Sequence, residues 1–245
     1  MINQLISPSL IFQFDPINGL LDLQSETGSI SLNRCRMQLV IRGMRGVHRF
    51  PLAGWQEVQN YSSTIQSSHG PLDALVYRQT LDDTGIEVMV TFALAQEAPM
   101  LTWKFDIRND GEDPVWIEKI EFLRVGGQSQ FGEFHLTSED QVDHMTFFSN
   151  GWQSWSTTGA YQADQSMRVS RLGLLQQPMI VNHGTPAIRM KGYFTSDFFG
   201  ALANVRTGDG FVAGFLSQTQ QFGGIEALLY DRPSLAIWTA DSCRL

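Results

Sequence analysis

The chain has 245 residues, of which 42% are hydrophobic and 17% are charged, and its formal net charge is −8. This composition is typical of a folded globular protein, and the length allows one large domain or two smaller ones. The acidic balance disfavours nucleic acid or an anionic membrane as a partner, because both require a basic surface. No signal peptide is evident, and no apolar run approaches the roughly 20 residues of a membrane-spanning helix.

The first part of the chain predicts short strands. Apolar runs between Leu10 and Ile41 are separated by turn residues, and no helix-capping pattern precedes them. The alternation of apolar and polar residues is clearest in 86–95 and 101–108, which predicts strands with one buried face. A partner strand is expected over 115–125, after the turn that follows Arg108.

The second part of the chain predicts loops that alternate with strands. We expect a loop over 126–143 that contains one short strand, Glu133 to Leu136. The polar segment 157–182 is expected to be irregular, with Met167 to Leu172 as a short strand. Later strands are expected over 193–205, 210–218, 221–230 and 234–240. With about fifteen strands and no helix, the fold is predicted to be all-β, either one very large two-sheet sandwich or two sandwiches side by side.

Cysteine and histidine give little sign of metal or redox chemistry. Cys35 and Cys243 lie far apart in the sequence, so we expect two buried free thiols and a reducing, cytoplasmic compartment. His135 and His144 lie near acidic residues, but their spacing matches no metal-ligand motif. We therefore expect no metal and no cofactor.

The most informative stretch runs from Phe147 to Ser156 and contains Trp152, Gln153, Ser154 and Trp155. Asn150-Gly151 before it predicts a bend, because both residues tolerate positive φ. Two indoles with amide and hydroxyl groups between them suit a sugar, whose CH face stacks on an aromatic ring while its hydroxyls meet polar groups. The alternative is that both tryptophans are ordinary core residues of a β-protein.

Catalytic motifs are missing from the sequence. It contains no nucleophile elbow, phosphate-binding loop or dinucleotide-binding fingerprint. The paired carboxylates Asp82-Asp83, Glu112-Asp113 and Glu139-Asp140 all lie at turn signals, where Asp is common for backbone reasons. Asp197, flanked by aromatic residues, is expected either to order a loop or to hold a sugar hydroxyl.

Three segments together resemble a known family. They are Phe148–Ser156, Gly192–Gly200 and the pair Gly214–Gln218 with Phe222–Glu226, and they look like the N-terminal domain of glycoside hydrolase family 36 α-galactosidases. The resemblance covers the chain from about Thr146 onward and is only a general strand-rich likeness before that point. It implies that residues 1–245 form a single β-supersandwich, built from two large antiparallel sheets with essentially no helix.

The resemblance also implies a role. In that family the N-terminal domain packs against a catalytic (β/α)8 barrel, which is followed by a small C-terminal β-domain. Both catalytic carboxylates of the retaining reaction lie on the barrel, so this chain alone is expected to be inactive. In that family, a tryptophan of this domain forms one side of the galactose site, and Trp155 is the matching residue here. Trp152, Gln153 and Ser154 are expected to shape its loop.

The expected partners are therefore the barrel of the same parent chain, an α-galactoside substrate, and a second copy of the chain in a homo-oligomer. The chain ends at Leu245 soon after an apolar strand, whereas domains usually end in polar residues, so we expect more protein to follow. This reading predicts an exposed apolar face where the barrel would dock.

Two other functions remain open at the level of sequence. A stand-alone carbohydrate-binding module would use the same tryptophans as a free sugar platform and would bind sugar without a partner. An aldose-epimerase-like enzyme would need a general acid and base in a cleft, usually histidine with a carboxylate. The five histidines show no such motif.

Overall fold

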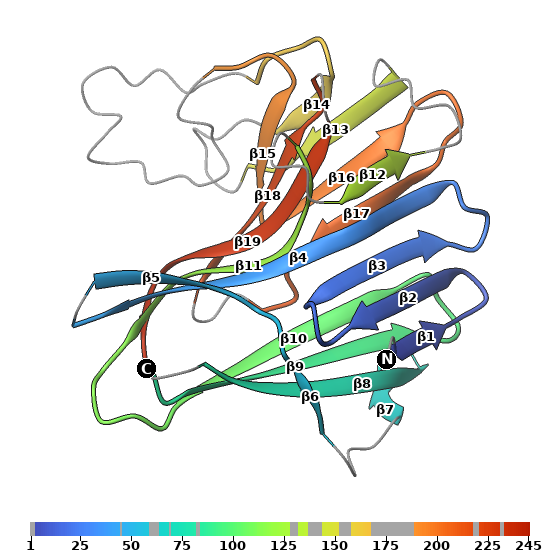
Figure 1. Ribbon diagram of the computed structural model, residues 1–245. Helices are drawn as coiled ribbons and strands as arrows, with labels where there is room; N and C mark the ends of the chain where they lie inside the picture. Colours follow the sequence, from blue (N-terminus) through green and yellow to red (C-terminus); the bar gives the residue numbers. More distant parts are fainter. Residues whose placement is uncertain are drawn as a thin grey trace.

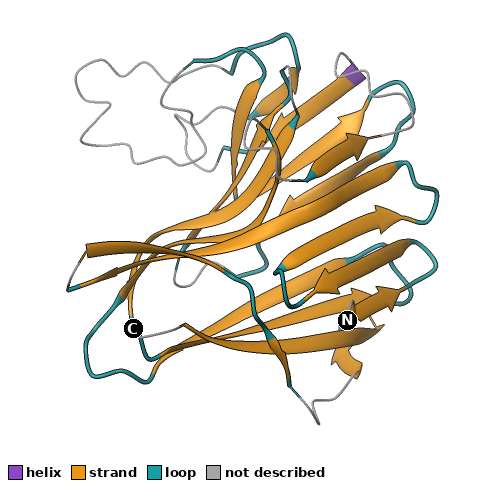
Figure 2. Cartoon of the chain, viewed as in Figure 1, coloured by secondary structure: helices purple, strands orange, loops and turns teal. Residues whose placement is uncertain are grey.

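The computed structural model describes residues 3–44, 46–58, 64–68, 70–81, 84–127, 132–136, 144–151, 158–167, 189–217, 221–230 and 233–245. These residues form nineteen β-strands (Figure 1). Figure 2 shows strands joined by loops, with one very short helical turn. The prediction of an all-β sandwich is confirmed.

One sheet contains ten strands, all paired antiparallel with their neighbours. The order is β1-β2-β3-β4-β11-β19-β18-β15, and β5 and β12 also pair with β4. The strand bounds are β1 Asn3–Ile6, β2 Leu10–Asp15, β3 Leu20–Ser25, β4 Ile30–Gly43, β5 Gly46–Pro51, β11 Trp116–Gly126, β12 Glu133–Leu136, β15 Tyr193–Asp197, β18 Phe222–Leu228 and β19 Ser234–Arg244.

Two smaller sheets form the second layer. A five-stranded sheet has the order β10-β9-β8-β6 with β7 paired to β8, and a four-stranded sheet has the order β14-β13-β16-β17. Their bounds are β6 Gln56–Glu57, β7 Thr64–Ser67, β8 Gly70–Leu81, β9 Ile86–Ala95, β10 Leu101–Asn109, β13 Met145–Ser149, β14 Gly159–Gln162, β16 Phe199–Asn204 and β17 Gly210–Gly214. The ten-stranded sheet therefore faces two separate sheets.

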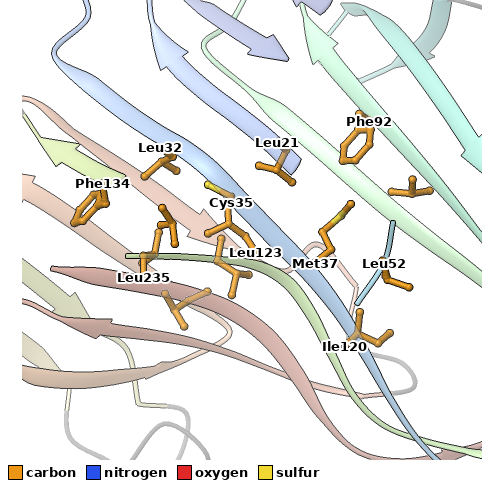
Figure 3. Packing of buried hydrophobic residues seen from close by; sticks show 14 of the residues in the cluster. Leu21, Leu32, Cys35, Met37, Leu52, Phe92, Ile120, Leu123, Phe134 and Leu235 are labelled. Carbon is orange, nitrogen blue, oxygen red and sulfur yellow. The ribbon is translucent and has the colours of Figure 1, made fainter. Parts of the chain in front are cut away.

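Aromatic contacts join the layers. On β9 the residues of one parity, Ile86 to Leu94, are completely buried, as the alternation predicts. The Phe92 ring lies 4.8 Å from the Phe12 ring and 4.9 Å from the Phe14 ring of β2. Figure 3 shows Phe92 beside Leu21 and other core residues of the ten-stranded sheet. One hydrophobic cluster includes residues of all three sheets.

A close backbone approach at Gly19 fixes the β2–β3 turn against the segment after β5. A side chain at Gly19 would place its Cβ 1.8 Å from the Leu52 carbonyl oxygen, and φ there is +63°. Only glycine satisfies both conditions. The Trp55 N–H donates to the Pro16 carbonyl at 2.9 Å, which fixes the segment that leads into the second layer.

Several predicted elements are wrong in extent, and the strand expected over 210–218 ends at Gly214. Residues 159–162 form β14 although the sequence there is polar and was expected to be irregular, because pairing with β13 supplies the backbone bonds. The last strand continues to Arg244, opposite Trp116 of β11, rather than ending at residue 240. The short strand expected over Met167 to Leu172 lies outside the described residues, except for Met167 itself.

Cys35 is expected to be unreactive in the folded protein. It is free and completely buried, and burial together with the nearby Asp22 carboxylate raises the pKa of its thiol well above the ordinary value. Native-state iodoacetamide labelling followed by peptide mass spectrometry should leave Cys35 unmodified, and labelling in denaturant should modify it. Rapid native labelling at Cys35 would contradict this expectation. The Cys243 side chain lies outside the part that the structure describes.

Candidate functional site

The loop between β13 and β14 holds the four predicted site residues. Trp152, Gln153, Ser154 and Trp155 lie outside the described residues, but both ends of the loop are described. The Gly151 N–H donates to the Thr158 hydroxyl at 3.0 Å, so the two ends are held next to each other. The described part of the candidate site is therefore the base of this loop.

Asn150 fixes the start of the loop to the end of β15. Its N–H donates to Ser196 Oγ at 2.7 Å, and its side-chain amide donates to the Asp197 carbonyl at 3.0 Å. In return, the Asp197 N–H donates to the Asn150 carbonyl at 2.8 Å. One residue earlier, the fully buried Ser149 hydroxyl donates to the Thr195 carbonyl at 2.7 Å. These bonds link the four-stranded sheet to the ten-stranded sheet.

The sequence signal at Asn150-Gly151 has a different cause from the one predicted. Neither residue has a positive φ. Asn150 is instead required for its hydrogen bonds, since its amide and its backbone both reach the neighbouring strand. Sequence reasoning marked the position correctly but could not identify this anchoring role, because the partners lie about 46 residues away.

The strands that flank the loop rest on a flat aromatic stack. Phe147 of β13 and Tyr161 of β14 are paired in register, and both rings stack on Phe194 of β15. The ring centroids lie 5.8 Å and 5.5 Å from that of Phe194, within the usual range for stacked aromatic pairs. The loop therefore leaves from two strands that are both packed on the larger sheet.

Phe198 is the point where the chain changes sheets. The single strand expected over 193–205 is wrong, because β15 belongs to the ten-stranded sheet and β16 to the four-stranded sheet, with only Phe198 between them. Its φ of 67° is unfavourable for a bulky residue. The structure compensates with a hydrogen bond from its N–H to the Gly223 carbonyl at 2.9 Å and a ring contact at 4.7 Å with Phe222.

Three sequence segments therefore meet at the base of one loop. They contribute Asn150, the corner from Ser196 to Phe198, and the pair Phe222-Gly223. Asp197 lies at their centre and is completely buried. Its position and its backbone bonds to Asn150 fit the expected loop-ordering role rather than contact with a solvent-borne sugar hydroxyl.

An ionic cluster crosses the ten-stranded sheet near this corner. Arg124 donates from Nε and from a terminal nitrogen to the Glu121 carboxylate, both at 2.9 Å, and Lys119 Nζ lies 2.7 Å from it. Burial alone would raise the pKa of Glu121, but these cationic donors outweigh it and hold the pKa at about 2. On β15, burial and the Glu226 carboxylate raise the pKa of Tyr193, which keeps its hydroxyl protonated.

The outer face of the four-stranded sheet is apolar next to the loop base, whereas Thr146 and Gln162 lie farther along the same face. This face, turned away from the ten-stranded sheet, has Phe148, Ala201 and Val212 in register across β13, β16 and β17. Phe199 stacks on Phe148 beside the loop base and is 42% exposed, and Val212 is 72% exposed. Contiguous apolar surface of this kind marks contacts with other proteins or domains.

The described residues show no built metal site and no membrane-spanning helix. Among them, no three His, Cys, Asp or Glu side chains are grouped closely enough to hold a metal ion. No helix in the described part is long and apolar enough to cross a membrane. His135 Nε2 lies 3.4 Å from the Glu133 carboxylate on β12, while His48 is exposed on β5. His69 and His183 fall outside the described ranges.

Comparisons with known proteins give a limited result. No protein-family model and no curated protein matches the chain. Two solved structures are similar over 100% of this chain, and both are GH36 α-galactosidase variants from Geobacillus stearothermophilus, one in complex with 1-deoxygalactonojirimycin and the other with raffinose. The TM-score is 0.46 for both, and the identities are 7% and 8%. The chain spans 40% of the length of these structures, and similarity at this level assigns no family.

Proposed function

We propose that this chain is the non-catalytic N-terminal domain of an α-galactosidase-like glycoside hydrolase and that its β13–β14 loop forms one wall of the sugar site. The observation that carries the proposal is the meeting of three segments at the loop base. These same segments, far apart in sequence, resemble the family N-terminal domain, and Asn150 ties two of them together directly.

The loop base has the mechanical properties that such a wall requires. An indole stacked on a sugar discriminates between sugars only if its ring is held in place, so the supporting residues must be fixed. Ser149 and Asn150 are bonded to β15, and Gly151 is bonded to Thr158 across the loop. Trp155 is proposed to contact the sugar, while Trp152, Gln153 and Ser154 shape the loop.

The apolar outer face supports the accessory role. A domain that packs against a second domain needs an exposed apolar surface, and Phe148 and Phe199 provide one directly beside the loop base. In this proposal the catalytic carboxylates belong to the second domain, where retaining hydrolysis requires two of them about 5–5.5 Å apart. The present chain positions and shapes one side of the sugar site, and none of its residues transfers a proton in the reaction.

The test is the substitution Trp155→Ala in the complete protein that contains this chain. Loss of one stacked indole should lower kcat/KM for an α-galactoside about tenfold to hundredfold, which corresponds to about 1.4–2.7 kcal/mol. Trp116→Ala is the matched control, because Trp116 lies on β11 between Arg42 and Arg244 and far along the chain from the loop. An unchanged kcat/KM in Trp155→Ala would contradict the proposal.

A binding measurement separates this function from a stand-alone carbohydrate-binding module. Titration of the 245-residue chain with galactose and raffinose in a calorimeter should give no saturable heat, because only one wall of the site is present. Saturable binding that Trp155→Ala abolishes would favour the free module instead. The gene sequence downstream of the Leu245 codon provides an independent check, since the proposal requires an open frame with alternating strand and helix patterns.

A further inference from the structure

A polar hollow on the outer face of β2, β3 and β4 is not used by the proposed function. These strands are neighbours in the ten-stranded sheet (Figure 1). Gln13 and Asp22 are paired in register on the outer face, while the adjacent Phe14 and Leu21 are buried in the core. The hollow has a volume of about 150 Å³, enough for one small organic molecule. Its lining residues are Gln13, Asp15, Leu20, Asp22 and Arg34.

Arg34 reaches the hollow through a β-bulge in β4. Between two register pairs, β3 advances from Leu21 to Leu23, whereas β4 covers three residues, from Cys35 back to Leu32. At this bulge Arg34 has a φ of 55°, in the left-handed region that residues with side chains rarely adopt. Bulges of this kind re-aim a side chain, and such unfavourable backbone conformations are common at ligand-binding sites. Both features favour a binding role for Arg34.

The bulge is fixed from both sides. The Arg34 N–H donates to Asp22 Oδ1, which ties the bulge to β3. On the other side, a Cβ at Gly132 would lie 2.1 Å from the Asn33 carbonyl oxygen and 2.9 Å from the Arg34 carbonyl oxygen, so the backbone of residue 132 packs directly on the bulge. The position of Arg34 is therefore set before a ligand arrives, and this lowers the entropy cost of binding.

Opposite charges line the hollow without pairing with each other. Within the described ranges of the chain, the Arg34 guanidinium forms no ion pair with Asp15, Asp22 or any other carboxylate. The Asp15 carboxylate accepts bonds from the turn that follows it, including one from the Asn18 amide at 2.7 Å. Asp22 Oδ2 and the Gln13 amide bond to none of the described residues. The hollow therefore offers one free cation and one free carboxylate oxygen.

We propose that this hollow binds a small zwitterion, a free α-amino acid. The planar fork of the Arg34 guanidinium matches the ligand carboxylate, while Asp22 Oδ2 and the Gln13 amide oxygen accept from the ligand ammonium group. An aliphatic ligand side chain then lies against Leu20. A ligand with a single charge is attracted by one of Arg34 and Asp22 and repelled by the other, whereas a zwitterion is attracted by both. The hollow lies outside the sugar site, so the two functions are tested independently.

Titration of the isotope-labelled 245-residue chain with L-alanine, followed through backbone amide chemical shifts, tests the proposal. The amides of Gln13, Asp22 and Arg34 should shift saturably at millimolar alanine. Propionate and ethylamine are the matched ligands, because each keeps one charged group of alanine and lacks the other. Both should bind at least about tenfold more weakly, since each loses one charge-assisted contact. Equal binding of all three ligands, or saturable shifts of these residues with galactose but not with alanine, would overturn the proposal.

Two substitutions keep the backbone of the bulge and remove one charge each. Glycine tolerates positive φ, so Arg34→Gly should fold normally and raise the dissociation constant for alanine at least about tenfold. Asp22→Asn keeps an acceptor for the Arg34 N–H and should weaken binding to a similar extent. Arg206→Gly is the matched control, because Arg206 is exposed in the turn after β16 and does not line the hollow, and it should bind alanine like the wild type. An unchanged affinity in Arg34→Gly, or a wild-type chain without saturable shifts, contradicts the assigned site.

Discussion

Phe92→Ala should lower the free energy of unfolding by about 3–5 kcal/mol, the usual cost of removing a large, fully buried aromatic side chain. Phe92 is completely buried between the two layers, and its ring meets those of Phe12 and Phe14. The substitution removes apolar contact from both sheets at once and leaves a cavity that the rigid sheets cannot close. Urea unfolding monitored by circular dichroism measures the change.

Two further variants make this prediction specific. Phe92→Leu fills part of the cavity and should cost clearly less than Phe92→Ala. Phe199→Ala makes the same chemical change at a position that is 42% exposed on the outer face, and it should cost about 1 kcal/mol or less. An equal decrease in the free energy of unfolding for Phe92→Ala and Phe199→Ala would contradict the prediction that the contacts around Phe92 stabilise the fold more strongly.

Glu121→Gln should destabilise the fold at neutral pH by about 2–3 kcal/mol, because it removes the acceptor of the bonds from Lys119 and Arg124. The folded-state pKa of Glu121, about 2, lies below its reference value of 4.5. The ionised carboxylate therefore stabilises the fold above about pH 4.5, and this contribution is lost as the pH falls through about 2. The difference in unfolding free energy between wild type and variant should shrink over the same interval.

The control for this prediction is another carboxylate in an ion pair. Glu118 lies 2.6 Å from Arg42, but both side chains are substantially exposed, and exposed pairs contribute about 0–1 kcal/mol. Glu118→Gln should therefore have a small effect that weakens in salt. Denaturant unfolding at several pH values compares the two variants. A Glu121→Gln deficit that stays constant from pH 7 to pH 2.5 would contradict the assigned pKa.

One part of the candidate site could be predicted from the sequence, and the other part depends on contacts between residues that are distant in the sequence. The unusual pair of tryptophans marks the β13–β14 loop in the sequence, and Asn150-Gly151 predicts a bend beside it. Trp152 and Trp155 remain predictions, because they lie outside the described residues. The bonds from Asn150 to Ser196 and Asp197 join strands of different sheets, and no local pattern announces such a contact.

The strand character of this protein follows from local residue patterns. Side chains on a strand alternate between two faces, so the parity of Ile86 to Leu94 and the turn after Arg108 were readable locally. Which sheet each strand joins depends instead on contacts that exist only in the folded chain. Phe198 sits in a stretch that looks like one continuous strand, and contacts with Gly223 and Phe222 of β18 help to stabilise its left-handed backbone. Likewise, β14 forms because β13 offers a partner, and β19 runs to Arg244 because β11 continues beside it. Periodicity is a property of neighbouring residues, whereas strand pairing depends on partners far away in the sequence, and the sequence pattern does not encode that pairing locally.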